Sequence, residues 1–256
     1  MEQRSNEWFR ARLGKLTASE ISCLMKDHRE LMTREELAAY KAANPQSRTT
    51  TKTAPFSDAT YTYLNRKIME NFMPLNSTSA EIQDIIKEYI EEHSFSNRAT
   101  QWGSYWEDKA REEYAKTMGY EVVQIGFEPY KKYPNLVGAS PDGLIRQERG
   151  GVEIKCPYTM EKHMQHLTYT TPKDLKENED NYYWQMYACM LVTDCEWWDF
   201  VSYNPYVSKK LQLKVLRIYR DEKEINLLKN RIDLAIEYIK QQINFLSTTD
   251  CIIISV

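Results

Sequence analysis

Hydrophobic and polar positions along the chain follow the periods of helices and strands in turn, which predicts a mixed α/β fold. Helical spacing of the apolar residues marks the segments 5–12, 17–26, 58–72, 79–93, 104–120, 175–192 and 222–246. Alternating or β-rich runs mark strands at 120–128, on both sides of the Pro-Asp-Gly turn in 136–145, and at 150–156, 195–203 and 211–220. The polar, Thr-rich stretch 44–60 is expected to be a loop. The core order α-β-β-β-α-β-β-α predicts a mixed sheet with helices packed on it, an α/β class with α+β character.

The segment GGVEIKCPY (150–158) contains the most informative of these strands. The glycine pair is expected to form the turn before the strand, and Pro157 ends it. Because alternate residues of a strand share a face, Glu153 and Lys155 point one way while the apolar residues between them point into the core. A solvated strand with a salt-bridged pair and an active-site strand both fit these nine residues, so the rest of the chain must decide.

The segment TASEISCLMK (17–26) is a candidate anion site. Thr17 and Glu20 have the spacing of a capping box. The unpaired N–H groups and the dipole at a helix start both favour a negative ligand. Arg12 lies just upstream and Ser19 lies in the first turn, so both are placed to contact that ligand.

Composition limits the function classes only loosely. With 42% hydrophobic residues, the 256-residue chain can bury a sizeable core, and its net charge of −3 carries no overall nucleic-acid signature. A local basic groove can still lie on an acidic protein. No apolar signal region opens the sequence and no run approaches 18 apolar residues, so we expect no membrane partner and a cytoplasmic location. The spacing of the cysteines favours free thiols over zinc or iron–sulfur sites; they are Cys23, Cys156, Cys189, Cys195 and Cys251.

Three carboxylates and one lysine carry the candidate chemistry. Glu107 is expected on a helix, Asp142 in a turn between two strands, and Glu153 and Lys155 on the next strand. Because Mg²⁺ prefers carboxylates, carbonyls and water, Asp142, Glu153 and the Ile154 carbonyl can clamp one ion. Lys155 beside that ion can activate a water and offset phosphate charge, which is the apparatus of metal-assisted phosphodiester hydrolysis. An Asp followed by E-x-K also arises by chance, so the pattern needs support from elsewhere.

Four blocks supply that support through resemblance to a known family. They are WFRARLGKLTASEI (8–21), WGSYWEDKAREEYA (102–115), VGASPDGL (137–144) with GVEIKCPYT (151–159), and NYYWQMYACMLV (181–192) running into the WWDFVSYNP strand. In this order they resemble the phage lambda exonuclease and the YqaJ-type viral recombinase nucleases. The resemblance implies a PD-(D/E)XK, restriction-endonuclease-like core with flanking helices.

The resemblance also implies an activity. It points to a Mg²⁺-dependent exonuclease, with Mn²⁺ as a substitute, that degrades one strand of linear duplex DNA from its 5′ end. The product would carry 3′ single-stranded tails for an annealing protein. By position, Asp142, Glu153, the Ile154 carbonyl and Glu107 correspond to the metal ligands, and Lys155 to the residue that activates the water.

Two more residue sets follow from the same resemblance. Arg12, Ser19 and Ser140 correspond to the pocket for the 5′-terminal phosphate, in agreement with the anion site inferred above. Tyr182 and Gln185 correspond to a pair that lines the metal site or orients the water. The two lie one helical turn apart and therefore share a face.

The chain departs from the family pattern in two places. Glu161, with Lys162 beside it, occupies a position where the family carries an arginine for the terminal phosphate, so either Lys162 substitutes or the phosphate dependence is weaker. The segment 28–100 is longer than the family leads us to expect. We otherwise interpret residues 1–256 as one exonuclease domain that contains this insertion. Family members form toroidal trimers around DNA, which implies a homo-oligomer, and a phage or prophage origin implies the cytoplasm of a bacterial host.

Two alternatives stay open. A PD-(D/E)XK endonuclease would use the same catalytic residues without the end-phosphate pocket. A DNA-end-binding recombination scaffold would keep the fold but not the chemistry.

Several residues also have simple structural interpretations. Trp8 is more typical of a core anchor than of a DNA contact. Trp197 and Trp198 are expected on opposite faces of a strand. The H-x-x-H spacing of His163 and His166 lacks the companions of a zinc site.

Overall fold

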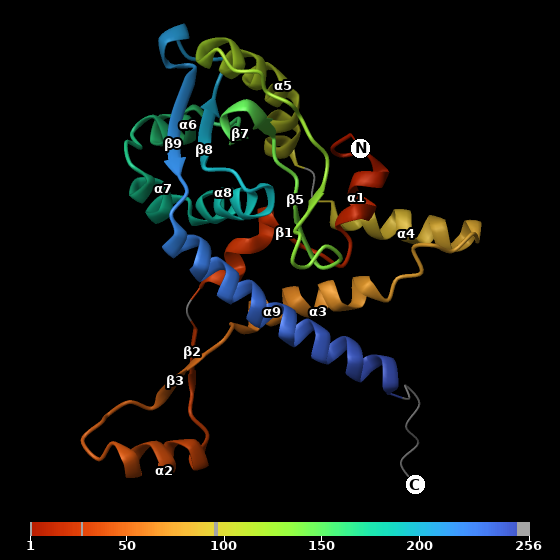
Figure 1. Cartoon of the computed structure of the whole chain (residues 1–256), viewed down its shortest axis with the longest axis vertical. Coiled ribbons are helices and arrows are strands. Elements are labelled where there is room, and N and C mark those ends of the chain that lie inside the picture. The colour runs from red at the N-terminus through yellow and green to blue at the C-terminus, as the bar shows by residue number, and fades with distance from the viewer. Residues whose placement is uncertain (1, 27, 95–96, 250–256) are drawn as a thin grey trace.

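The computed structural model describes residues 2–26, 28–94 and 97–249, and Figure 1 shows their arrangement. The α-helices are α1 Asn6–Arg12, α2 Arg34–Ala43, α3 Asp58–Asn71, α4 Ala80–His93, α5 Arg98–Met118, α6 Met160–Leu167, α7 Pro172–Asn178, α8 Asp180–Thr193 and α9 Glu222–Thr248. The strands are β1 Leu16–Thr17, β2 His28–Leu31, β3 Thr51–Ala54, β4 Glu128–Pro129, β5 Val137–Ala139, β6 Gly143–Ile145, β7 Gly150–Lys155, β8 Trp197–Tyr203 and β9 Leu213–Tyr219. Three 3₁₀ helices complete the described elements: η1 Ala18–Met25, η2 Arg146–Glu148 and η3 Lys209–Leu211.

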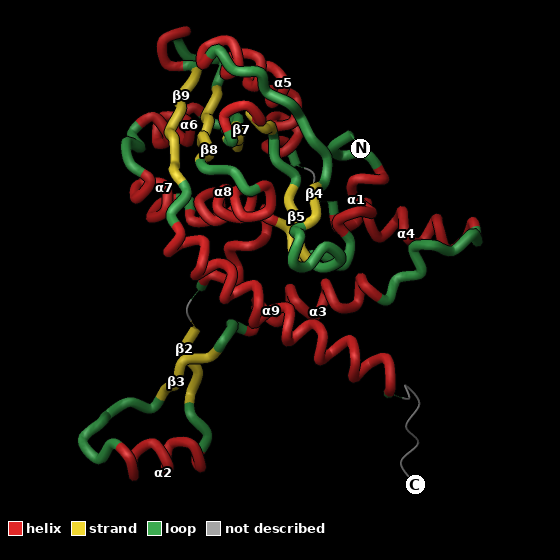
Figure 2. Tube along the Cα trace, viewed as in Figure 1, coloured by secondary structure: helices red, strands yellow, loops and turns green. Residues whose placement is uncertain are grey.

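The main sheet has the order β6-β7-β8-β9 and mixed direction. β7 pairs antiparallel with β6 and parallel with β8, and β8 pairs antiparallel with β9. A parallel pair requires a crossover connection, and α6, α7 and α8 supply it between β7 and β8. Figure 2 shows β7, β8 and β9 with the helices α5, α6, α7 and α8 around them, so the expected mixed sheet with helices packed on it is confirmed.

The two faces of this sheet bury different clusters. Val152 and Ile154 of β7 pack with Ala110 and Tyr114 of α5. Trp198 and Phe200 of β8 belong to the larger cluster, which α8, α9 and η1 complete. Glu153 pairs in register with Phe200, so Glu153 and Lys155 lie on the α8 side of the sheet. The predicted alternation along β7 is therefore confirmed, and so is the placement of Trp197 and Trp198 on opposite faces.

The glycine pair has a different role from the one predicted. Gly150 and Gly151 lie within β7, and the turn before them uses Arg149, whose φ is 49°. A Cβ on Gly150 would stand 2.2 Å from the ring of Trp197, and one on Gly151 would stand 2.4 Å from Trp198. The glycines therefore make room for two indoles on the neighbouring strand.

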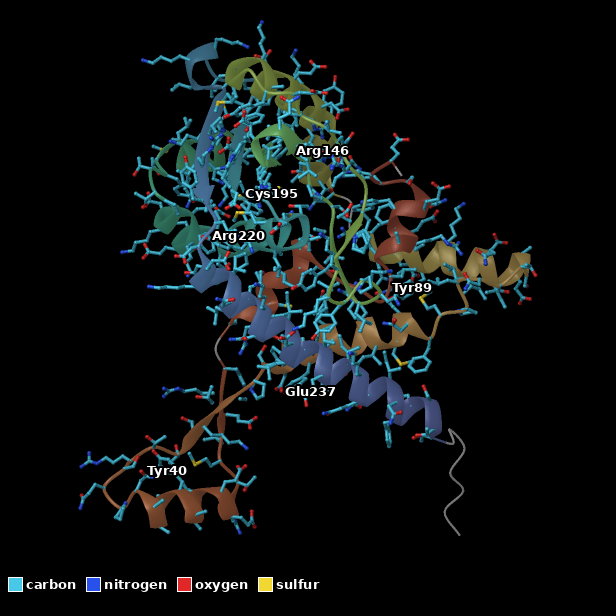
Figure 3. The ribbon with its side chains drawn as sticks, viewed as in Figure 1. Tyr40, Tyr89, Arg146, Cys195, Arg220 and Glu237 are labelled. Atoms are coloured by element: carbon cyan, nitrogen blue, oxygen red, sulfur yellow. The ribbon has the colours of Figure 1, made fainter. Side chains whose placement is uncertain are left out.

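The segment expected to be a loop is part of a projecting arm. β2 and β3 pair from His28↔Ala54 to Leu31↔Thr51, and α2 lies at the far end of this ladder. We call residues 28–54 the arm. Figure 1 shows it extending away from the rest of the fold, and in Figure 3 Tyr40 marks its tip. No residue of α2 is buried, so the arm has little core of its own.

Three other expectations need correction. The strand expected at 120–128 reduces to an isolated bridge between Val123 and Leu144 and the two residues of β4. The helix expected at 175–192 divides at Glu179, whose buried carboxylate accepts a hydrogen bond from Tyr169 at 3.3 Å. The segment after Thr17 is a 3₁₀ helix without a side-chain cap, because the Thr17 hydroxyl donates to the Glu20 carboxylate instead.

The remaining expected elements occur close to their predicted bounds, including the helices at 58–72 and 79–93. The helix expected at 104–120 is α5, which begins six residues earlier, at Arg98, and ends at Met118. Cys251 lies outside the described residues. Among the residues described, no helix has both the length and the apolar character needed to cross a bilayer.

Candidate active site

The two strands β6 and β7 bring two carboxylates together. Asp142 immediately precedes β6, and Gly143 pairs with Val152, so the antiparallel ladder places Asp142 next to Glu153. Asp142 Oδ2 accepts a hydrogen bond from the backbone N–H of Ile154 at 2.7 Å. This bond ties the aspartate to the backbone between Glu153 and Lys155, and it holds all three polar side chains in one place.

Glu153 and Lys155 form a buried ion pair. Glu153 Oε1 lies 2.5 Å from Lys155 Nζ, and the glutamate is fully buried. The ammonium also lies over the ring of Tyr182 on α8, 4.6 Å from its centroid. The other oxygen, Glu153 Oε2, is buried without a hydrogen-bond partner in the described part of the chain. A buried carboxylate oxygen without a partner is costly and is typical of a ligand site.

The electrostatics of the cluster favour a bound cation. Removal from water raises the pKa of Asp142 well above its ordinary value, and the charges of Glu153 and Glu107 raise it further. Burial also raises the pKa of Glu153, and Lys155 opposes that rise. For Lys155, burial lowers the pKa, but Glu153 and Asp142 outweigh it and the net shift is upward. The lysine therefore stays charged beside carboxylates that crowd one another.

Glu107 approaches this cluster from α5 and is held by two arginines. Arg111, one turn further along α5, donates to Glu107 Oε1 at 2.8 Å, and Arg4 donates to Glu107 Oε2. The backbone of Arg4 has a φ of 66°, and the neighbouring Gln3 amide donates to the carbonyls of Ile125 and Pro141. The N-terminal segment thus lies against the turn that carries Asp142.

Arg111 is a site residue that the sequence interpretation missed. Its Nε donates to the backbone carbonyl of Asp142 at 2.9 Å, while its other nitrogens contact Glu107 and Asp108. One buried guanidinium therefore connects the helix-borne carboxylate to the turn aspartate. The signal was present as an acid and a base four residues apart, E-D-K-A-R, but that spacing is also common on solvated helices.

These donors fit a hard divalent ion in part. Asp142 and Glu153 are oxygen ligands of the type that Mg²⁺ prefers, and Glu153 Oε2 is free to bind one. Both oxygens of Glu107 are engaged by arginines, so its predicted role as a ligand would require Arg4 to move aside. Within the described ranges, no three His, Cys, Asp or Glu side chains are already arranged around a common metal position.

Arg12, Ser19 and Ser140 converge as the sequence predicted they would. Arg12 donates to Ser140 Oγ at 3.2 Å and to Ser19 Oγ at 2.9 Å, which joins α1, η1 and the end of β5. Burial lowers the pKa of Arg12, and the charge of Glu20 opposes that shift. A guanidinium with two hydroxyls around it is a suitable receptor for a phosphate group.

Trp8 belongs to this pocket rather than to the core. Its indole N–H donates to Ser140 Oγ at 2.9 Å, and the Arg12 guanidinium stacks 4.2 Å from its ring centroid. The expectation of a core anchor was wrong because both the ring and the N–H are used by pocket residues, and no residue of α1 is buried.

One cavity of about 1190 Å³ joins the two sites. Lys155, Tyr182 and Glu107 form one part of its wall, and Trp8 and Arg12 form another. Four predicted residues lie just behind the lining, each bonded to a residue in it: Asp142, Glu153, Ser19 and Ser140. Part of the remaining wall is α4, from which the Tyr89 hydroxyl donates to Glu70 on α3 (Figure 3).

The other predicted residues divide between the cavity and the core. Lys162 lines the cavity, whereas Glu161 is exposed and does not. Gln185 is buried on α8 but is not part of the lining, unlike Tyr182. His163 and His166 both bond through Nδ1 to Ser202 Oγ, at 2.9 and 2.8 Å, so they connect α6 to β8.

Replacing Arg111 with methionine tests its role as a positioning residue. The change keeps the length and apolar stem of the side chain but releases Glu107 and the Asp142 carbonyl. We expect metal affinity, measured by calorimetry without DNA, to weaken by about 10- to 100-fold, as for other residues that orient metal ligands. Arg146→Met, on exposed η2 (Figure 3), is the matched control and should leave affinity unchanged. Equal affinity of the Arg111 variant and the wild type would exclude the role.

Comparisons with known proteins bear on the family and the fold of this chain. The model of the YqaJ-like viral recombinase domain matches residues 7–196. The crystal structure of an alkaline exonuclease, LHK-Exo from Laribacter hongkongensis, shares 25% identity over 95% of this chain and 96% of its own, with a TM-score of 0.66. The structure of LHK-Exo in complex with dAMP gives the same identity and TM-score over 94% and 96% of the two chains.

A phage related exonuclease from Haemophilus somnus 129PT shares the fold at 14% identity, with a TM-score of 0.60 over 91% and 96% of the chains. No curated protein matches the sequence. The fold class expected from the sequence is therefore confirmed.

Proposed function

Because the chain belongs to the YqaJ-like viral recombinase family, we propose that it is a Mg²⁺-dependent exonuclease acting on linear duplex DNA. It degrades one strand from the 5′ end and leaves a 3′ single-stranded tail. The observation that carries the proposal is one cavity whose lining contains both Arg12 and Lys155, with Glu153 bonded to Lys155 just behind the wall. A receptor for a terminal phosphate beside a hydrolytic cluster suits an enzyme that works from ends.

The residues divide the work between holding the end and cleaving the chain. Arg12, with Ser19 and Ser140, binds the terminal phosphate, and the Trp8 ring fixes the plane of the guanidinium. Lys162, whose ammonium pairs with the buried carboxylate of Glu179, also lines this cavity, where the family carries an arginine. Its position in the lining, with Glu161 outside, supports substitution by Lys162 rather than a weaker phosphate dependence.

The hydrolytic cluster acts on the next phosphodiester. Asp142 and Glu153 hold the metal with the Ile154 carbonyl, and Arg111 keeps Glu107 and the Asp142 turn in place. Mg²⁺ bound there supplies Lewis-acid polarisation of the phosphate and of the attacking water. Lys155, charged and aligned by Glu153 and Tyr182, donates to the oxygens on which negative charge develops.

Digestion of linear duplex DNA with Mg²⁺ tests the proposal. Ends with a 5′ phosphate are compared with 5′-hydroxyl ends, with a closed circle, and with the Lys155→Ala variant. We expect mononucleotides from the phosphorylated linear substrate, slower release from hydroxyl ends, and none from the circle. Cutting of the circle would establish the endonuclease instead, and metal-independent binding without cleavage would establish the scaffold.

Replacing Arg12 with alanine should remove the preference for a 5′ phosphate. A charged hydrogen bond to phosphate contributes about 1.5–3 kcal/mol, so we expect the ratio of kcat/KM between phosphorylated and hydroxyl ends to fall by about 10- to 100-fold. The rate on hydroxyl ends should change little. Arg10→Ala, on the same helix but bonded to Leu75 and Gln83, is the matched control. A ratio that stays at the wild-type value would place the phosphate elsewhere.

The remaining parts of the proposal rest on family membership. Mn²⁺ substitutes for Mg²⁺, an annealing protein receives the 3′ tail, and the chain works as a homotrimer around DNA. The chain is a single nuclease domain of phage or prophage origin that acts in the host cytoplasm. Cleavage assays with Mn²⁺ and mass measurement in solution address the first and third of these statements directly.

A further inference from the structure

A group of three exposed tyrosines and two half-buried tryptophans lies beside the cavity. Tyr105 on α5 is 76% exposed, Tyr206 after β8 is 67% exposed, and Tyr158 after β7 is 49% exposed. Trp102 lies between the last two, with ring centroids 5.9 Å from Tyr158 and 5.0 Å from Tyr206. Trp106 continues the group, 5.6 Å from Trp102 and 5.1 Å from Tyr105. We call these five residues the aromatic platform.

Hydrogen bonds hold the platform to the catalytic strand. The Trp102 indole N–H and the Asn204 amide both donate to the carbonyl of Pro157, at 3.1 and 3.2 Å. The backbone N–H of Tyr206 in turn donates to Asn204 Oδ1 at 3.0 Å. Pro157 follows Lys155 by two residues, so the three segments that carry the platform meet at the end of β7. The Trp102 ring and the backbone that carries Tyr158 and Tyr206 are therefore held in place before any ligand arrives.

The platform is continuous with the cavity. Pro157 and Tyr158 belong to the cavity lining, and so do Gly103 and Ser104 of α5, which precede Tyr105. Tyr105, Tyr158 and Tyr206 donate no hydrogen bond from their hydroxyls within the described ranges of the chain. Their rings are large apolar surfaces that remain in water, where folding gains nothing from them.

We propose that the aromatic platform binds single-stranded DNA, namely the strand that the enzyme leaves intact, as its bases lose their partners at the cavity. The proposal rests on the exonuclease function proposed above. Exposed aromatic rings stack on unpaired bases of any sequence, because every base has a π-face. Paired bases inside a duplex are already stacked and offer no free face to such a ring. A platform next to the hydrolytic cluster is therefore suited to the strand that has just been freed.

Binding of a fluorescent dT oligonucleotide in EDTA tests the platform separately from cleavage. The Tyr105→Ala/Tyr206→Ala double variant removes two rings that do not line the cavity. We expect its affinity to fall at least about tenfold, because each stacked base contributes measurably to binding. Tyr105→Phe/Tyr206→Phe keeps the rings and should bind as the wild type does. Tyr219→Ala, 66% exposed at the opposite end of the sheet, is the matched control and should also be neutral.

Each other outcome overturns the proposal. Unchanged affinity of the alanine variant would show that the strand binds elsewhere. Loss of binding in the phenylalanine variant would show hydroxyl contacts rather than stacking. A change of molecular mass in the alanine variant alone would identify the platform as an interface between copies. Because binding is measured in EDTA, where no metal-dependent cleavage occurs, the result can be interpreted even if the proposed nuclease activity is not found.

Discussion

Lys155→Ala is expected to slow single-turnover release of nucleotides by about 10²- to 10³-fold at saturating Mg²⁺. The Lys155 ammonium is ion-paired with Glu153 Oε1, and no other lysine contacts that glutamate in the described part of the chain. Its net raised pKa keeps it charged at neutral pH, so its contribution is a positive charge rather than a base. Removing it leaves the developing phosphate charge without this donor.

Binding of DNA ends should survive the same change. Arg12 donates to both Ser19 and Ser140, and none of the three is bonded to Lys155. Because changes at sites that share no partner act independently, we expect the Kd for a phosphorylated duplex end, measured in Ca²⁺, to stay within about threefold. Lys116→Ala, at the exposed end of α5, is the matched control for both measurements. A variant that binds as before and cleaves at the wild-type rate would remove Lys155 from the mechanism.

Asp142→Asn is expected to abolish metal-dependent cleavage and yet stabilise the metal-free protein. The asparagine oxygen can still accept the Ile154 N–H bond, while one of the crowded carboxylate charges disappears. The native pKa of Asp142 is raised above its unfolded value. The protonated side chain therefore costs the folded state little at low pH. As the pH rises through the native pKa, the side chain ionises in the folded protein and the free energy of unfolding falls.

The gain should be modest because Asp142 keeps some exposure. We expect about 1 kcal/mol at pH 8 in EDTA, or roughly 2–4 °C in Tm for a chain of this size, and less at pH 5. Thermal melts with and without Ca²⁺ check the result, because the ion should stabilise the wild type more than the variant. A variant with a lower Tm than the wild type at pH 8 in EDTA would show that the Asp142 charge does not destabilise the metal-free fold.

The part of the site that lies on regular strands could be predicted from the sequence. The two-residue period of β7 determines that Glu153 and Lys155 share a face, and the Pro-Asp-Gly turn places Asp142 beside them. The resemblance of the family blocks then suggested the Arg12 pocket. Two of its residues, Arg12 and Ser140, form a hydrogen bond although they lie 128 residues apart in the sequence. No local pattern predicts a contact of that separation.

What the sequence could not show depends on contacts whose partners are far apart or ambiguous. Arg111 looked like an ordinary helix-surface base until the fold placed the Asp142 carbonyl beside it. The glycine pair resembled a turn because the rings that require glycine there belong to a distant segment. Trp197 and Trp198 pair with Gly150 and Gly151, and each lies 47 residues after its partner in the sequence. The arm has a polar, Thr-rich sequence with little apolar periodicity, so its strand β3 was indistinguishable from a loop.

The arm is joined to the rest of the fold in a way that would allow it to be removed or replaced. Its two strands leave and re-enter the fold side by side, at His28 and Ala54, so a short turn could connect them in place of everything beyond. A chain shortened in this way would keep the catalytic cavity, whose lining contains no arm residue. The same junction is a natural position for grafting a foreign module, for example one that recruits the nuclease to a chosen protein, without altering the chemistry.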